Sequence, residues 1–185
     1  MKQENKHIEE NLEELISDLR KGKSDAFQIL YKKYNQKVYR FCLRMLGDSE
    51  QANDAFQETF IKVYEHRKDF RGTNFKAWLF TIARHTCLNS IRSRKDHDSF
   101  DEVFHGSMHA IDTNFALKDH IDQAIAMVPI SLREALILRE YEQYSYQEIA
   151  DFLEIDLSLA KVRVYRARML LRKLLKPLVK ELNES

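Results

Sequence analysis

Apolar residues recur at helical spacing in four segments before residue 95 and in four segments after residue 115. In the first segment they form one stripe, on a helix that Gly22 can end as a left-handed cap. The stripe consists of Leu12, Leu15, Ile16 and Leu19. A second helix is expected from about Asp25 to Leu46, followed by Gly47. Its stripe is largely aromatic and consists of Phe27, Leu30, Tyr31, Tyr34, Val38, Phe41 and Met45.

Two more helices are predicted before residue 95. Asp48 or Ser49 offers an N-cap for the third helix. Its apolar residues are Ala52, Ala55, Phe56, Phe60 and Val63. The fourth helix is expected from Phe75 to about Arg94, after a turn at residues 69–74. The segment 96–115 then holds five acids, three His and no Lys or Arg, without a sustained apolar period, so it is predicted to be a flexible linker.

Behind this linker, helices are expected near residues 116–127 and 132–141, with Pro129 between them. The capping box, a motif of helix N-termini, is matched twice, by Ser131 with Glu134 and by Ser145 with Glu148. In that motif the Ser and the Glu reciprocally satisfy backbone donors that the first turn of a helix leaves free. The two boxes predict helix starts at Ser131 and Ser145.

Residues 150–160 have the spacing of a helix-turn-helix. A helix ends there, a tight turn follows at residues 154–156, and Asp156 or Ser158 can cap a new helix. At 3.6 residues per turn, the stripe that faces the core consists of Ala160, Val164, Ala167 and Leu171. The opposite face holds Ser158, Lys161, Val162, Tyr165, Arg166, Met169 and Arg172. Its first two turns are placed to reach base edges, and the later basic residues to neutralise phosphates.

Composition agrees with an all-α protein of two small helical domains. The chain is 44% hydrophobic and 32% charged, with only four Gly and two Pro, which favours helices joined by short turns. The formal net charge of +1 conceals a segregation, because the stretch 157–180 contains no acid. Its cations are Lys161, Arg163, Arg166, Arg168, Arg172, Lys173, Lys176 and Lys180. Since DNA responds to local charge, and a capped helix and turn precede this stretch, DNA binding is favoured over a merely solvated basic face.

Three features of the sequence bear on the location of the protein and on metal or disulfide chemistry. No apolar run reaches bilayer length, and the polar start at residues 1–14 lacks the apolar core of a signal peptide, so the sequence predicts a cytoplasmic protein. Cys42 and Cys87 lie in helical patterns and are expected to be buried thiols. His105 and His109 have a spacing that can bind a metal on a helix, but no third ligand is evident, so no metal site is predicted.

Two sets of motifs resemble the extracytoplasmic-function sigma factors of bacterial RNA polymerase, which belong to the sigma-70 family. Residues 145–150, Ser-Tyr-Gln-Glu-Ile-Ala, and 164–168, Val-Tyr-Arg-Ala-Arg, resemble region four of that family. Residues 54–60, Asp-Ala-Phe-Gln-Glu-Thr-Phe, look like the polymerase-binding helix of region two. The promoter-melting segment of region two is similar to residues 70–84, which begin with Phe70-Arg71 and end with Trp78-Leu79-Phe80-Thr81-Ile82-Ala83-Arg84. The resemblance covers roughly residues 20–180.

The resemblance implies region two at residues 1–95, a linker at 96–115 and region four, a helix-turn-helix, at 116–185. It implies an alternative sigma factor that binds core RNA polymerase and directs promoter-specific transcription initiation. No catalytic residue, metal, cofactor or small-molecule substrate is expected. The implied partners are core RNA polymerase, promoter DNA and an anti-sigma factor, which a membrane could hold.

The resemblance also assigns residues to each contact. Core polymerase would be bound by one helix face that carries Asp54, Gln57 and Glu58. The minus-ten element would be contacted by Thr73, Asn74, Trp78, Asn89, Arg92 and Arg94, with the loop at 72–74 helping to capture a flipped base. The minus-thirty-five element would be read by Ser158, Leu159, Lys161, Val162, Arg163, Tyr165 and Arg166.

Some positions depart from the family pattern. The reading helix commonly opens with Gly-Thr-Val and continues Lys-Ser-Arg, whereas residues 158–163 are Ser-Leu-Ala-Lys-Val-Arg, so the preferred target sequence cannot be transferred. A Gly frequent in the family's turn is replaced by Glu154. This replacement is expected to alter the turn slightly.

Simpler alternatives remain open for individual features. An acid-rich helix face is commonly just solvated, and Trp78 is expected to be at least partly buried in the core. A stand-alone helix-turn-helix regulator would bind a duplex by itself, usually as a dimer. Besides a sigma factor and a stand-alone regulator, the third possible function is that of an enzyme acting on nucleic acid. No carboxylate cluster, His/Cys site or phosphate loop in the sequence supports it.

Overall fold

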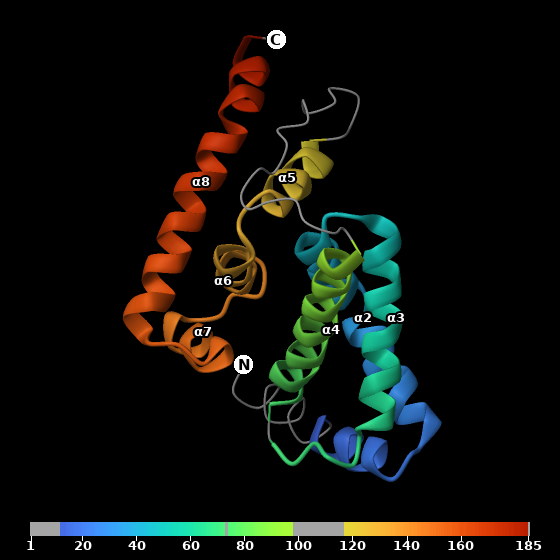
Figure 1. Ribbon diagram of the computed structural model, residues 1–185. Helices are drawn as coiled ribbons and strands as arrows, with labels where there is room; N and C mark the ends of the chain where they lie inside the picture. Colours follow the sequence, from blue (N-terminus) through green and yellow to red (C-terminus); the bar gives the residue numbers. More distant parts are fainter. Residues whose placement is uncertain (1–11, 73, 98–116, 185) are drawn as a thin grey trace. The chain divides into compact units, whose positions relative to one another are not determined.

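The computed structural model describes residues 12–72, 74–97 and 117–184, without the side chains at 95–97, 117–119 and 181–184. These residues form helices joined by turns, with no strand among them (Figure 1). They divide into two compact units. Unit 1 consists of the described residues up to Cys42 together with Glu50–Ser90, and unit 2 of Leu43–Ser49 together with the described residues from Ile91 onward. The all-α prediction is confirmed.

The first helices follow the apolar stripes closely. Residues 12–20 are helical, and α2 (Ser24–Leu46), α3 (Ser49–Glu65) and α4 (Phe75–His97) follow. Gly22 and Gly47 have φ values of 82° and 72°, so both take the left-handed conformation that ends a helix without steric cost in glycine. The α4 helix extends three residues beyond the predicted end at Arg94, into the segment predicted as a linker.

Aromatic side chains hold unit 1 together. Phe41 of α2 packs edge-on against Phe80 of α4, with ring centroids 5.3 Å apart, and Tyr34 lies 5.8 Å from Phe75. Cys42 and Cys87 are buried free thiols, as predicted. Because aromatic rings bury large areas and prefer edge-to-face contacts, this core fixes α2 and α4 firmly against each other.

Unit 2 contains α5 (Leu117–Ala126), α6 (Ile130–Glu140), α7 (Tyr146–Leu153) and the long α8 (Leu157–Glu184). The α8 helix packs against α5, α6 and α7, and Figure 1 shows α7 joined to the start of α8 by a short turn. One buried cluster of the core of unit 2 consists of Ala135, Leu138, Tyr144, Ile149, Ala150, Leu153, Ala160 and Val164. Of the predicted α8 stripe, Ala160, Val164 and Ala167 are fully buried and Leu171 is half-buried.

The first of the two predicted capping boxes is wrong. Helix α6 begins at Ile130 with Pro129 as its N-cap and no side-chain cap, so Ser131 lies inside the first turn. The carbonyl of Pro129 accepts from the amides of Leu132 and Arg133 at 2.9 and 2.8 Å. Proline, which has no amide hydrogen and a fixed φ, starts the helix two residues early. Glu134 is buried instead of reaching back to cap the helix.

The second capping box is confirmed. The Ser145 hydroxyl accepts from the Glu148 amide at 3.2 Å, and the Glu148 carboxylate accepts from the Ser145 amide at 2.7 Å. Helix α7 ends at Leu153, and its C-cap is Glu154, whose φ of 55° and ψ of 48° are left-handed. The Ile155 amide donates to the Ala150 carbonyl at 3.0 Å. This is the Schellman arrangement, here with glutamate where glycine is usual.

Candidate functional site

One face of α3 is exposed and acidic. Asp54, Gln57 and Glu58 are all exposed, whereas the opposite face is buried in unit 1. That buried face consists of Ala52, Ala55, Thr59, Phe60 and Val63. Glu58 is paired with Lys62 one turn later, at 2.6 Å. The predicted helix face therefore exists, and packing within unit 1 leaves it free for another molecule.

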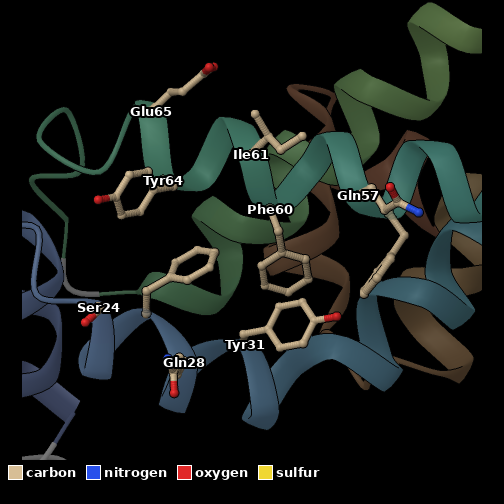
Figure 2. A pocket seen from close by; sticks show the side chains of 10 residues that line it. Ser24, Gln28, Tyr31, Gln57, Phe60, Ile61, Tyr64 and Glu65 are labelled. Atoms are coloured by element: carbon tan, nitrogen blue, oxygen red, sulfur yellow. The ribbon is translucent and has the colours of Figure 1, made fainter.

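A groove between α2 and α3 lies beside this acidic face. Its volume is about 630 Å³, and Figure 2 shows the rings of Tyr31 from α2 and Phe60 from α3 next to one another in its lining, with centroids 4.8 Å apart. The lining is largely aromatic and consists of Ser24, Phe27, Gln28, Tyr31, Phe56, Gln57, Phe60, Ile61, Tyr64 and Glu65. Gln57 belongs to both the acidic face and the groove.

The sequence analysis missed the apolar part of this surface. Ile61 is 57% exposed and Tyr64 is 40% exposed. They follow Gln57 by four and seven residues, so they continue its helix face. The signal was available, because both are large apolar residues that fall outside the buried stripe of α3. Exposed apolar patches rimmed by polar groups are typical of binding sites for other macromolecules.

The start of α4 contains the predicted base-capturing residues. Thr73 lies outside the described residues. The side-chain oxygen of Asn74 accepts from the Ala77 amide at 2.9 Å and so caps α4. Trp78 is half-buried and packs against Phe70 and Phe75, with centroids at 5.1 and 5.7 Å. The prediction that Trp78 is partly core is confirmed, and part of its surface remains accessible.

A second depression, of about 350 Å³, includes the accessible part of Trp78. Its lining consists of Lys62, His66, Asp69, Trp78, Ile82, His85 and Thr86. The His66 ring lies 3.0 Å from the Asp69 carboxylate, and Lys62 donates to the Thr86 hydroxyl at 3.4 Å. An aromatic surface combined with a cation and hydrogen-bonding groups suits a nucleotide.

Asn89, Arg92 and Arg94 on α4 are all exposed. Asn89 and Arg92 are three residues apart and share a helix face, whereas Arg94 points about 140° away from Asn89 around the helix. The structure therefore brings two of these three residues together. Arg94 presents its charge on another side of α4.

In unit 2, the first turns of α8 expose the predicted reading face. Ser158, Leu159, Lys161, Val162, Tyr165 and Arg166 are all exposed, and Arg163 is half-buried. Arg168 is engaged within the unit, since it donates to the Glu140 carboxylate of α6 at 2.6 Å. The remaining cations of these turns are available on the surface that carries Lys161 and Arg166.

Among the described residues, no group of three His, Cys, Asp or Glu side chains is arranged to hold a metal ion. His105 and His109 lie outside those residues. In the described part of the chain, no helix has the length and apolar character needed to span a bilayer. An exposed acidic and aromatic surface on one unit and a basic helix-turn-helix on the other are the features expected of a DNA-binding transcription protein that also docks on a protein partner.

Comparisons with known proteins identify the family. Residues 30–97 match the protein family described as "Sigma-70 region 2", and residues 118–171 match the family described as "Sigma-70, region 4". The RNA polymerase sigma-H factor of Pseudomonas aeruginosa is 34% identical over 94% of this chain and 98% of its own length. The ECF RNA polymerase sigma factor SigW of Bacillus subtilis is 30% identical over 92% of this chain and 100% of its own.

A solved structure agrees with these relatives. The sigma factor RpoE of Bartonella quintana, solved in complex with the anti-sigma factor NepR, has a TM-score of 0.66 and 28% identity over 81% of this chain and 96% of its own. The chain belongs to the extracytoplasmic-function group of the sigma-70 family. It is an alternative sigma factor that acts in promoter-specific transcription initiation, and it is not an enzyme.

Proposed function

We propose that three surfaces of this sigma factor each bind a different component of the initiation complex. The α3 face with its aromatic groove binds core RNA polymerase, the start of α4 holds the minus-ten element, and the first turns of α8 read the minus-thirty-five element. The observation that carries the polymerase assignment is the groove, because its exposed apolar surface beside Gln57 would lose its water when a partner binds and so form the centre of an interface. Interfaces derive most of their affinity from such a centre.

The polymerase surface combines both kinds of contact that a stable interface needs. Ile61 and Tyr64 supply apolar area, and Asp54, Gln57 and Glu58 form a polar edge around it. Each of these side chains is exposed in the free chain and so is accessible to a partner. The acids would meet basic groups on the polymerase.

Alanine replacement tests this surface. We expect Asp54→Ala combined with Gln57→Ala, and separately Ile61→Ala, to weaken core binding by about tenfold or more, as loss of interface contacts worth about 1.4 kcal/mol does. Lys37→Ala, an exposed position on α2, is the matched control. Binding is measured by titrating labelled chain with core enzyme, and helix content by circular dichroism. Unchanged affinity in both variants would refute the assignment.

Promoter melting requires unpaired bases to be held after they leave the stack. Asn74 and Trp78, at the start of α4, offer a hydrogen-bonding amide and an aromatic surface for this task. Arg92, near the C-terminal end of the same helix, offers a separate cation. Because Asn74 also caps α4, alanine would confuse loss of the cap with loss of a base contact. Asn74→Ser keeps a capping oxygen and removes the amide donor.

Asn74→Ser with Arg92→Ala is therefore expected to reduce permanganate reactivity of the minus-ten thymines in the holoenzyme complex, while core binding stays normal. Normal melting would refute the role of these two residues.

Binding of DNA by α8 should depend on the polymerase. In a gel shift, the chain with core enzyme is expected to retain a promoter duplex that the chain alone does not. Strong binding without core enzyme would instead favour the stand-alone helix-turn-helix regulator. Run-off transcription from genomic fragments with the reconstituted holoenzyme then identifies the promoters that the chain uses.

We further propose a cytoplasmic location and regulation by an anti-sigma factor. The Bartonella quintana relative was solved with such a protein. The apolar groove and the basic helix of this chain are exposed and could be covered by an inhibitor. Fractionation of native cells tests both ideas. Recovery of the chain as unbound, transcriptionally active protein under all growth conditions would contradict regulation by an inhibitor.

A further inference from the structure

The centre of the α8 reading face is apolar, although the helix as a whole is basic. Val162 is 40% exposed, Tyr165 is 64% exposed and Met169 is 45% exposed. No acid occurs between residues 157 and 180. Exposed apolar side chains therefore lie among the cations in the first turns of α8.

Helix geometry places these side chains on the face. At 100° per residue, Val162 lies about 170° around the helix from the centre of the stripe formed by Ala160, Val164 and Ala167. That stripe is fully buried, so Val162 points away from the core of unit 2. Lys161 and Arg166 lie on either side of Val162 and are exposed, in position for the phosphates that border a groove.

The major groove offers an apolar side chain one kind of apolar partner. Base edges there carry hydrogen-bond donors and acceptors, except for the 5-methyl group of thymine. Valine has no hydrogen-bonding group, so pressing it against a polar base edge would desolvate that edge without replacing its bonds to water. Contact with a methyl group instead buries apolar surface on both sides.

We propose that Val162, together with the ring of Tyr165, recognises thymine methyl groups in the minus-thirty-five element. This inference rests on the proposed role of α8 and adds the chemical feature that α8 recognises. The cations around Val162 set affinity through the phosphates, and the apolar centre discriminates between sequences.

The experiment uses holoenzyme and a promoter recovered by the run-off transcription described above. Each thymine of its minus-thirty-five element, on both strands, is replaced in turn by uracil, which pairs identically and lacks only the methyl group. At one or more positions we expect binding to weaken about fourfold, the factor that burial of one methyl group gives.

Two variants assign the effect to the protein side chain. Val162→Ala shortens an exposed side chain without lowering helix propensity, so the fold should persist. In this variant the penalty for uracil should fall to about twofold or less, because the methyl group has lost its partner. Val179→Ala is the matched control, since Val179 is 52% exposed on the same helix, more than four turns away. It should retain the full penalty.

The outcomes separate this inference from the proposed function. If holoenzyme yields no promoter, the proposed function fails. A promoter can be bound and yet have no thymine in its minus-thirty-five element, or replacement of its thymines by uracil can leave binding unchanged. Either result overturns only the recognition of methyl groups. An equal uracil penalty in wild type and Val162→Ala would also overturn it.

Discussion

Replacing Glu154 by glycine should stabilise unit 2, because Glu154 occupies a left-handed turn position that glycine adopts more easily. With φ at 55° and ψ at 48°, the glutamate Cβ crowds the following carbonyl, which costs about 1 to 2 kcal/mol. Glycine removes this cost, but it also gives the unfolded chain more conformational entropy, which lowers the free energy of unfolding by about 0.5 to 1 kcal/mol. The difference predicts a net gain of about 0.5 to 1 kcal/mol.

Hydrogen exchange in the full chain measures this gain locally. Amides of α7 and of the first turns of α8 should exchange about two- to fivefold more slowly in Glu154→Gly, which is the stated free energy expressed as an equilibrium constant. Peptides from α3 in unit 1 provide the internal reference. Glu154→Ala keeps a Cβ at the same φ and should not slow exchange. Exchange in Glu154→Gly that is as fast as in wild type would refute the strain argument.

Three further predictions concern packing, capping and pH. Ile149 is fully buried, so Ile149→Ala should cost about 2 to 5 kcal/mol; it should abolish helix-turn-helix DNA binding in gel shifts with core enzyme while Trp78 fluorescence still reports a folded unit 1. Ser145→Ala removes the acceptor of the Glu148 amide and should speed exchange in α7 by about fivefold, equivalent to about 1 kcal/mol; unchanged exchange would mean that the cap contributes nothing. Burial raises the pKa of Tyr34 above its ordinary value of 10.0, so the folded state keeps the proton longer than the unfolded state. The free energy of unfolding should therefore be unaffected by this group below about pH 10 and should fall as pH rises beyond it; urea unfolding followed by Trp78 fluorescence should show a shallower fall in Tyr34→Phe.

The sequence predicted those features that depend on neighbouring residues. Helix α7 and its capping box follow from Ser145 and Glu148, because both partners of each hydrogen bond lie within one turn. The exposure of Val162 and the burial of Val164 follow from helical periodicity alone. The acidic face of α3 was predicted in the same way, from the spacing of Asp54 and Gln57.

Where local signals compete, the sequence was less reliable. Ser131 fits a capping box as well as Ser145 does, but Pro129 starts α6 two residues earlier and makes Ser131 part of the first turn. Arg133 then donates to the Val128 carbonyl at 2.9 Å, and burial lowers the pKa of its guanidinium to about 10. Such burial depends on neighbouring helices, which a capping pattern does not describe.

The aromatic groove required tertiary structure. Tyr31 and Phe27 belong to the predicted apolar stripe of α2, yet Tyr31 is exposed, and both line the groove opposite Ile61 and Tyr64. Periodicity gives the direction of a side chain from its own helix, but the width of the gap to the next helix depends on how the helices pack. The sequence by itself therefore determined the helices, their buried faces and the basic reading surface of α8. Packing between α2 and α3 decided which apolar residues remain open to a partner, because burial depends on how two helices pack against each other and not on the periodicity of either helix alone.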